Sequence, residues 1–146
     1  MVLADDEPLS ARFQRAVVLQ RAGDHMGALK EYETFIKAAE SCDVDQESFA
    51  EVHVNVGAIN VKLKNMNEAK INFQKALSFR EMGSAHINLA LLALAEGKTS
   101  VNPVDGIEAL KTARIHCQRV IELNDDNAAI QIAEKLLRDI QIMLKS

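Results

Sequence analysis

Apolar residues recur at every third or fourth position along this chain, between short polar breaks, as in amphipathic helices. A first such segment follows Pro8 and ends at Gly23-Asp24, where Asp24 can cap the next helix by accepting backbone N–H groups. No stretch alternates apolar and polar residues as a half-buried strand does. The pattern therefore predicts an all-α chain of seven helices, with breaks near residues 23–24, 41–45, 65–67, 82–84, 97–104 and 124–127.

The breaks in the second half are the least regular. The fifth helix is expected over residues 85–96, with Ser84 as its cap, and residues 97–104 form a loop longer than the other turns. Asp105-Gly106-Ile107-Glu108 resembles a capping box, in which an acidic residue at each end satisfies free N–H groups. We therefore expect the sixth helix to begin at Asp105 and the last to span residues 128–145.

One short motif occurs twice in the middle of the chain. His53-Val54-Asn55-Val56-Gly57 returns as His86-Ile87-Asn88-Leu89-Ala90, with a small residue after apolar ones each time. The offset between the copies falls within the range of about 20 to 50 residues that is typical of stacked supersecondary units. Such stacks offer an extended binding surface and need no catalytic group, so the repeat favours binding.

Within residues 51–80, the small Gly57 follows Val56, and Ala69 is followed by the large Phe73 on the next helix. This stretch resembles a tetratricopeptide repeat, with Val56-Gly57 at the family's Leu-Gly pair and Ala69 with Phe73 at its Ala-x-x-x-Phe. Weaker copies carry Ala28 in the first repeat and Ala113 in the third.

The resemblance implies a right-handed superhelix of three antiparallel helical hairpins closed by a capping helix. The repeats are expected at about 9–42, 47–81 and 84–125, the third with a loop insertion at 97–104. Residues 126–146 would be the capping helix, and residues 1–8 a disordered or extended N-terminus.

Such proteins bind peptides or partner proteins on a concave face lined by the first helix of each repeat. Asn55 and Asn88 are expected there to hydrogen-bond a peptide backbone between apolar neighbours. An alternative is that some of these residues are covered by neighbouring helices, by the chain's own last helix or by a second copy. The expected groove residues are Phe13, Val17, Val54, Asn55, Ala58, Val61, Lys62, Ile87, Asn88, Leu91 and Leu94.

One subgroup of the family binds the Glu-Glu-Val-Asp tails of heat-shock chaperones through Lys, Asn and Arg side chains. The corresponding positions here are Phe13, Val17, Asn55, Ser84 and Asn88, of which Asn55 alone agrees. A carboxylate needs cationic or N–H donors in place of water, and these positions offer too few. We therefore expect no such clamp, and keep a co-chaperone role as an alternative function.

The last helix carries two apolar stripes. A capping helix normally buries one face, so the second stripe indicates either a broad buried face or a surface for self-association in a homodimer. The stripes are Ile130, Ala133, Leu137, Ile140 and Leu144, and Ile132, Leu136 and Met143.

The side chains that could bind a metal or take part in catalysis do not form a reactive site. His53 and His86 occupy equivalent packing positions, and His25 and His116 are expected apart from them, so no metal site or cofactor is expected. Gly97-Lys98-Thr99 lacks the upstream glycine of a phosphate-binding loop. The two cysteines, far apart along the chain and in no Cys-x-x-Cys motif, are typical of reduced intracellular proteins; they are Cys42 and Cys117.

Composition narrows the partner class. The net charge of −4 argues against nucleic acid, and no apolar run is long enough to span a membrane. The sequence thus predicts a non-enzymatic protein-interaction module, an adaptor or assembly scaffold, whose partner is another protein or peptide. We expect an intracellular, most simply cytoplasmic, location, and a mature organelle protein that has lost its presequence is the alternative.

Overall fold

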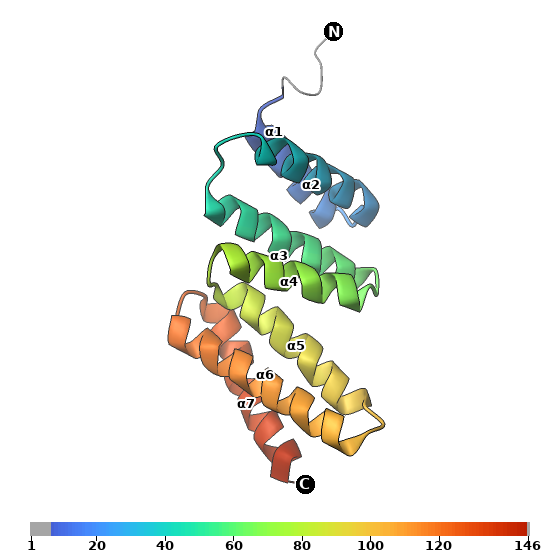
Figure 1. Cartoon of the computed structure of the whole chain (residues 1–146), viewed down its shortest axis with the longest axis vertical. Helices are drawn as coiled ribbons and strands as arrows, with labels where there is room; N and C mark the ends of the chain where they lie inside the picture. Colours follow the sequence, from blue (N-terminus) through green and yellow to red (C-terminus); the bar gives the residue numbers. More distant parts are fainter. Residues whose placement is uncertain (1–6, 146) are drawn as a thin grey trace. The chain divides into compact units, whose positions relative to one another are not determined.

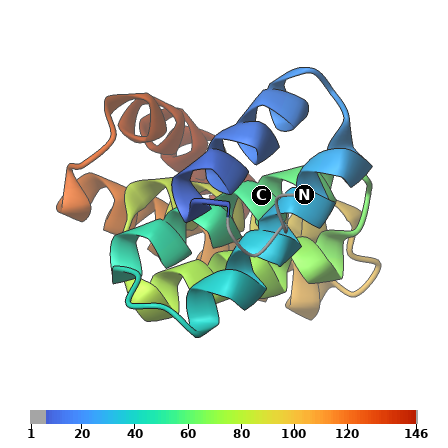
Figure 2. The same ribbon diagram turned by 90° about the horizontal axis from the view of Figure 1, so that it is seen from above.

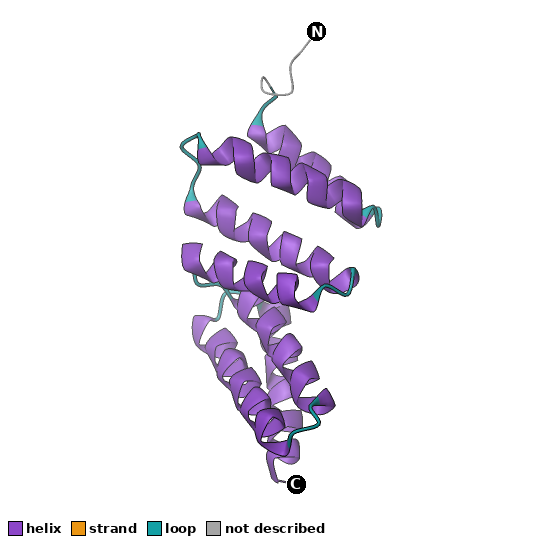
Figure 3. Cartoon of the chain, turned by 45° about the vertical axis from the view of Figure 1, so that its right-hand side comes forward, coloured by secondary structure: helices purple, strands orange, loops and turns teal. Residues whose placement is uncertain are grey.

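The computed structural model of the chain describes residues 7–145, and all regular structure in that range is α-helical (Figures 1 and 3). The all-α prediction is therefore confirmed. The helices are α1 Leu9–Arg21, α2 His25–Glu40, α3 Gln46–Lys62, α4 Met66–Phe79, α5 Gly83–Thr99, α6 Pro103–Leu123 and α7 Asn127–Lys145.

The chain divides into two compact units, residues 1–80 and 81–146. In the first unit, α1 pairs with α2 and α3 with α4, and α2 also packs on α3. In the second unit, α5 pairs with α6, and α7 packs against both. The paired helices can be followed by colour in Figures 1 and 2. Each predicted hairpin is thus present as an antiparallel helix pair.

The first hairpin is built around aromatic rings. Tyr32 is fully buried, and the ring of Phe13 meets its edge with centroids 6.1 Å apart. Phe13 also meets Phe35 at 5.9 Å, again edge to face. Such edge contacts add to the burial energy of the rings and fix α1 against α2.

The second hairpin depends on a missing side chain. A Cβ placed on Gly57 of α3 would lie 2.5 Å from Cε1 of Phe73 on α4, far inside van der Waals contact. Phe73 is fully buried, so the ring occupies the space that glycine leaves open. The small–large pairing expected from Val56-Gly57 and Ala69-x-x-x-Phe73 is therefore present.

The turns inside the first two hairpins share one backbone geometry. Gly23 has a φ of 85° in the first turn and Lys64 a φ of 67° in the second, both in the left-handed region. Glycine adopts this conformation without steric cost, whereas the side chain of Lys64 makes it unfavourable at that position. The Asp24 carboxylate accepts the Gly27 N–H at 3.0 Å, as the sequence predicted.

The connection between α5 and α6 differs from the sequence prediction. The expected loop at 97–104 shrinks to three residues, because α5 continues to Thr99 and α6 already begins at Pro103. The cap is Asn102, whose side chain accepts the Val104 N–H at 2.9 Å, and not Asp105. Proline at the first helical position needs no N–H partner, which favours this earlier start.

The N-terminus of α5 is capped from outside its own helix. The Asp125 carboxylate accepts the Gly83 N–H at 3.1 and 3.2 Å, so the expected cap Ser84 lies inside the helix. The neighbouring Asp126 caps α7 by accepting the Ala129 N–H at 3.1 Å. One acidic pair therefore stabilises two helix starts.

Both stripes of α7 contribute to packing in the second unit. Ala133, Leu136 and Ile140 are buried with residues of α5 and α6, whereas Ile132 is 42% exposed. A broad buried face accounts for most of the two stripes.

Two further expectations concern the ends of the chain and membranes. Most of the expected extended N-terminus, residues 1–6, lies outside the described range. No helix among the described residues is long and apolar enough to cross a membrane.

Candidate functional site

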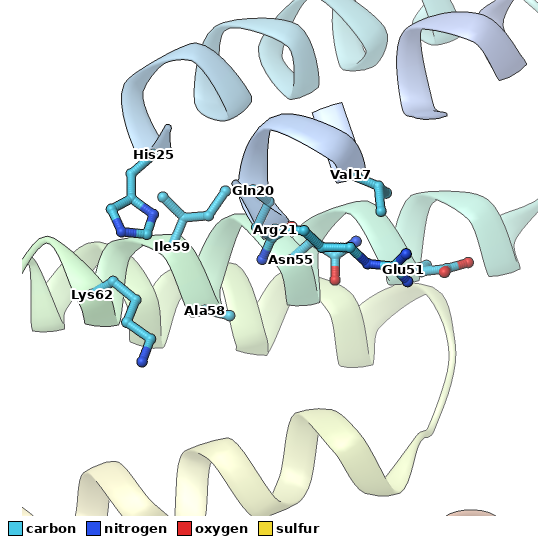
Figure 4. Close-up of a pocket in the computed structure, with 9 residues that line it drawn as sticks. All are labelled: Val17, Gln20, Arg21, His25, Glu51, Asn55, Ala58, Ile59 and Lys62. Atoms are coloured by element: carbon cyan, nitrogen blue, oxygen red, sulfur yellow. The ribbon is translucent and has the colours of Figure 1, made fainter. Parts of the chain in front are cut away.

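A hollow of about 470 Å³ lies in the first unit (Figure 4). It lies along the seam between α1 and α3, next to the start of α2. Its walls combine apolar side chains with amide and charged groups. The lining residues are Val17, Gln20, Arg21, His25, Glu51, Asn55, Ala58, Ile59 and Lys62.

A hydrogen-bond chain fixes the polar floor of this hollow. The Tyr32 hydroxyl donates to Oε1 of Gln20 at 2.8 Å and accepts from Nδ2 of Asn55 at 3.1 Å. Burial raises the pKa of the Tyr32 phenol, which therefore stays a neutral donor. Because Nδ2 of Asn55 is hydrogen-bonded to Tyr32, the Asn55 side chain has little rotamer freedom and its amide group keeps a fixed orientation.

Charges are distributed at both ends of the hollow. Figure 4 places Lys62 and His25 at one end, and Arg21 with Glu51 at the other. Nδ1 of His25 is buried and has no hydrogen-bond partner among the described residues. A buried imidazole nitrogen without a partner costs free energy that a ligand can recover.

A second hollow of about 260 Å³ lies at the N-terminal ends of α1 and α3. Phe13 and Phe35 form its apolar wall, and Glu51 lines both hollows. The other lining residues are Leu9, Ser10, Gln14, Val44 and Ser48. The two hollows thus follow one another along the same seam.

Five of the eleven predicted groove residues line these hollows. Val17, Asn55, Ala58 and Lys62 lie in the larger one and Phe13 in the smaller. Val54 and Val61 are half-buried elsewhere on α3.

The residues predicted on α5 have different environments. Ile87 and Leu94 are each 6% exposed and belong to the core formed with α6 and α7, so their assignment to an open groove is corrected. Coverage by neighbouring helices or by the last helix was the alternative kept open. Asn88 is half-buried and donates to the Ser84 carbonyl at 2.7 Å, and Leu91 is 42% exposed.

Sequence reasoning missed the charged groups Arg21, His25 and Glu51. A signal was present, because Arg21 and Lys62 are separated along the chain by the same spacing as Ala28 and Ala69. Aligning the first two repeats at this spacing places both cations in the last turn of the first helix.

The histidines at the repeated motif have packing partners. Nδ1 of His53 lies 3.1 Å from Oδ1 of Asn72, and Nδ1 of His86 lies 2.9 Å from Nδ1 of His116. The prediction that His116 lies apart from His86 was wrong. No group of three or more metal-ligating side chains occurs within residues 7–145.

Comparisons with known proteins agree with the helical hairpins. The family model of the tetratricopeptide repeat matches residues 50–81. The solved TPR2B domain of yeast Sti1, in its complex with pHsp70, superposes with a TM-score of 0.65 at 21% identity. That match covers 92% of this chain and 97% of the yeast domain. No curated protein matches the sequence.

Fold and site together define an all-α helical-repeat domain with a hollowed seam on its first two hairpins. Residues 50–81 match the tetratricopeptide-repeat model, and the chain shares the fold of a solved tetratricopeptide-repeat domain. Domains of this family act in general as non-catalytic modules for protein interaction.

Proposed function

We propose that this protein is an adaptor that binds an extended segment of a partner protein along the α1–α3 seam. The observation that carries the proposal is the larger hollow, which joins an apolar wall to a fixed amide and to cations. Val17, Ala58 and Ile59 would contact apolar atoms of the segment, and Asn55 would bond its backbone.

The length of the seam sets the size of the segment. Ser48 lies in the smaller hollow and Lys62 in the larger, at opposite ends of α3. They are about four helical turns apart, or about 21 Å, a length that about six residues of extended chain span. A large apolar side chain suits the smaller hollow, beside Phe13 and Phe35.

An acidic group in the segment would lie near Lys62 and His25. Both groups can donate to a carboxylate, and a carboxylate is also the natural partner for a buried nitrogen that lacks one. At the other end the opposite charges of Arg21 and Glu51 offset one another, so the net positive charge beside Lys62 gives the segment a preferred direction.

A chaperone tail is the second candidate, because the matched yeast domain was solved with pHsp70. Four of the five clamp positions differ from the chaperone-binding subgroup, which argues against it. Titration of the protein into a fluorescent Glu-Glu-Val-Asp peptide distinguishes chaperone-tail binding from the adaptor proposal. Saturable binding that Lys62→Glu weakens supports tail binding. Absence of binding at high micromolar concentration removes this candidate and leaves the adaptor proposal standing.

The adaptor proposal is tested with three baits: wild type, Lys62→Glu and Lys70→Glu. Lys70 is an exposed lysine on α4 that lines neither hollow, so it controls for the charge change. A partner retained by wild type and Lys70→Glu but lost from Lys62→Glu supports the seam as the binding site. Recovery of the same proteins by all three baits contradicts it.

The dissociation constant of the identified partner segment, measured for wild type and each variant, then gives the size of the effect. Reversing one charge next to a ligand carboxylate is expected to cost about 1 kcal/mol, or roughly fivefold in Kd. Leu91→Glu on α5 serves as a second comparison, since its side chain is exposed and outside the hollows. Light scattering of the free protein tests self-association, the remaining alternative.

A further inference from the structure

The second unit contains two facing histidines, one buried and one half-buried, with a carboxylate bonded to the buried one. His86, in the first turns of α5, is 7% exposed, and its Nδ1 faces Nδ1 of His116 on α6 at 2.9 Å. On its other side, Nε2 of His86 lies 2.6 Å from Oε2 of Glu81. One imidazole therefore joins a carboxylate to a second imidazole across two helices.

The preceding repeat contains the same position with different chemistry. Asn72 and His116 are separated by the same spacing as Ala69 and Ala113, so an amide stands where the third repeat has an imidazole. Nδ2 of Asn72 donates to the Glu68 carbonyl, which leaves Oδ1 to accept from His53. An amide oxygen accepts this hydrogen bond whether the histidine is neutral or charged.

The proton count of the His86–His116 pair follows from these contacts. The hydrogen bond from His86 lowers the pKa of Glu81, so the carboxylate is ionised and Nε2 of His86 is its donor. In the neutral pair, Nδ1 of His86 accepts from the Nδ1–H of His116. With one added proton, His86 donates at both nitrogens and Nδ1 of His116 accepts. With two, both facing nitrogens carry hydrogen, and the contact at 2.9 Å cannot be a hydrogen bond.

Surrounding charges favour the first proton over the second. Glu81 faces the pair from the segment before α5, and Asp125 lies at the start of that helix, where it accepts the Gly83 N–H. On α6, Arg119 approaches Glu81 at 3.6 Å and is itself paired with Glu122 at 3.1 Å. Three carboxylates and one guanidinium can balance a single imidazolium, whereas a second one adds like-charge repulsion inside the hairpin.

We propose that the His86–His116 pair is a proton-sensitive contact that holds one proton with its hydrogen bonds intact and breaks when it binds two. Acidification then weakens the α5–α6 hairpin. Imidazole is the side chain whose charge changes between about pH 5 and 8, so the contact responds within the range that cellular compartments span. The inference is independent of the peptide site, which lies on α1 and α3.

The wild-type protein provides the first test, by NMR of its imidazole nitrogens. The neutral pair requires the less common Nδ1–H tautomer at His116 and the Nε2–H tautomer at His86. Observation of both tautomers near pH 8 supports the shared hydrogen bond. The ordinary Nε2–H tautomer at His116, together with a neutral His86, overturns the proposal.

The second test compares wild type with His116→Asn, which copies the pair of the preceding repeat. The variant keeps the first protonation, because the amide accepts from a charged His86, and removes the second. When the pH falls from about 8 to one unit below the ordinary imidazole pKa of about 6.5, the unfolding equilibrium constant should rise. The rise for wild type should be about tenfold larger than the rise for the variant. Urea titrations followed by circular dichroism measure both constants.

Gln118→Asn, which changes an exposed side chain on the same helix and leaves both imidazoles in place, is the control and should keep the wild-type pH response. Equal responses of wild type and His116→Asn contradict the proposal. If His116→Asn does not fold, the tautomer measurement on wild type decides the question alone.

Discussion

Replacement of Gly57 by alanine tests how closely α3 and α4 approach. The added methyl carbon would lie 2.5, 2.8 and 2.9 Å from three ring carbons of Phe73, where ordinary contacts begin at 3.4 Å. Because Phe73 is fully buried, the ring has no solvent side to which it can turn. Either the ring or the whole helix has to shift by about 1 Å.

Two opposing effects set the magnitude. Overpacking a dense core costs about 1–3 kcal/mol, and three simultaneous close contacts place this site at the upper end. Alanine is a better helix former than glycine by about 1 kcal/mol, which partly offsets the clash. We expect Gly57→Ala to lower the free energy of unfolding by about 2 kcal/mol.

Urea unfolding followed by circular dichroism measures the effect, with Gly106→Ala as the control. A Cβ on Gly106 meets its nearest atoms at 3.3 and 3.6 Å, at the edge of ordinary contact, so this substitution in another buried helical site should destabilise the protein much less. A double-mutant cycle with Phe73→Leu isolates the clash, because the smaller side chain makes room for the methyl group. The reasoning is refuted if Gly57→Ala is as stable as wild type, or if the two substitutions are additive.

Three further predictions concern single groups. Burial lowers the pKa of His53, so its contribution to stability is present above the ordinary imidazole value of about 6.5 and is lost as the pH falls below it. His53→Gln should therefore reduce the acid-induced rise in unfolding, and an unchanged pH profile would show that burial of this ring has no such effect. Asp125→Ala removes the cap of α5 and should cost about 1 kcal/mol, whereas Asp105→Ala, which caps no helix, should cost a few tenths. Equal losses of thermal stability in these two variants would contradict the assigned cap. Burial raises the pKa of Cys117 to about 11, so a thiol reagent should label only the exposed Cys42 until urea is added, and labelling of both thiols in the folded protein would disprove this.

Local patterns predicted the helices and hairpins correctly because each signal resides in neighbouring residues. Asp24 caps α2 through a contact within one helical turn, and Gly57 pairs with Phe73 across one hairpin. The cap of α5 was missed because Asp125 reaches it from a distant part of the sequence. The early start of α6 was missed because Asn102 and Pro103 were read as loop residues.

Some residues of the expected groove line the two hollows. Asn55 and Lys62 are among them, because the repeat fixes which face of α3 they occupy. Ile87 and Leu94 share that pattern but belong to the core formed with α6 and α7, and periodicity does not reveal which apolar face later helices will cover. His25 was missed because it is the first residue of α2, outside the periodic apolar positions.

The sequence by itself determined the all-α class, the repeat and the small–large pairs, since these depend on spacing along the chain. Only the tertiary structure decided which apolar residues stay accessible and which polar groups meet. Gln20, Tyr32 and Asn55 form one hydrogen-bond chain from three helices, and His86 meets His116 across two. Such contacts depend on how helices pack face to face, a property of the assembled core and not of any one segment.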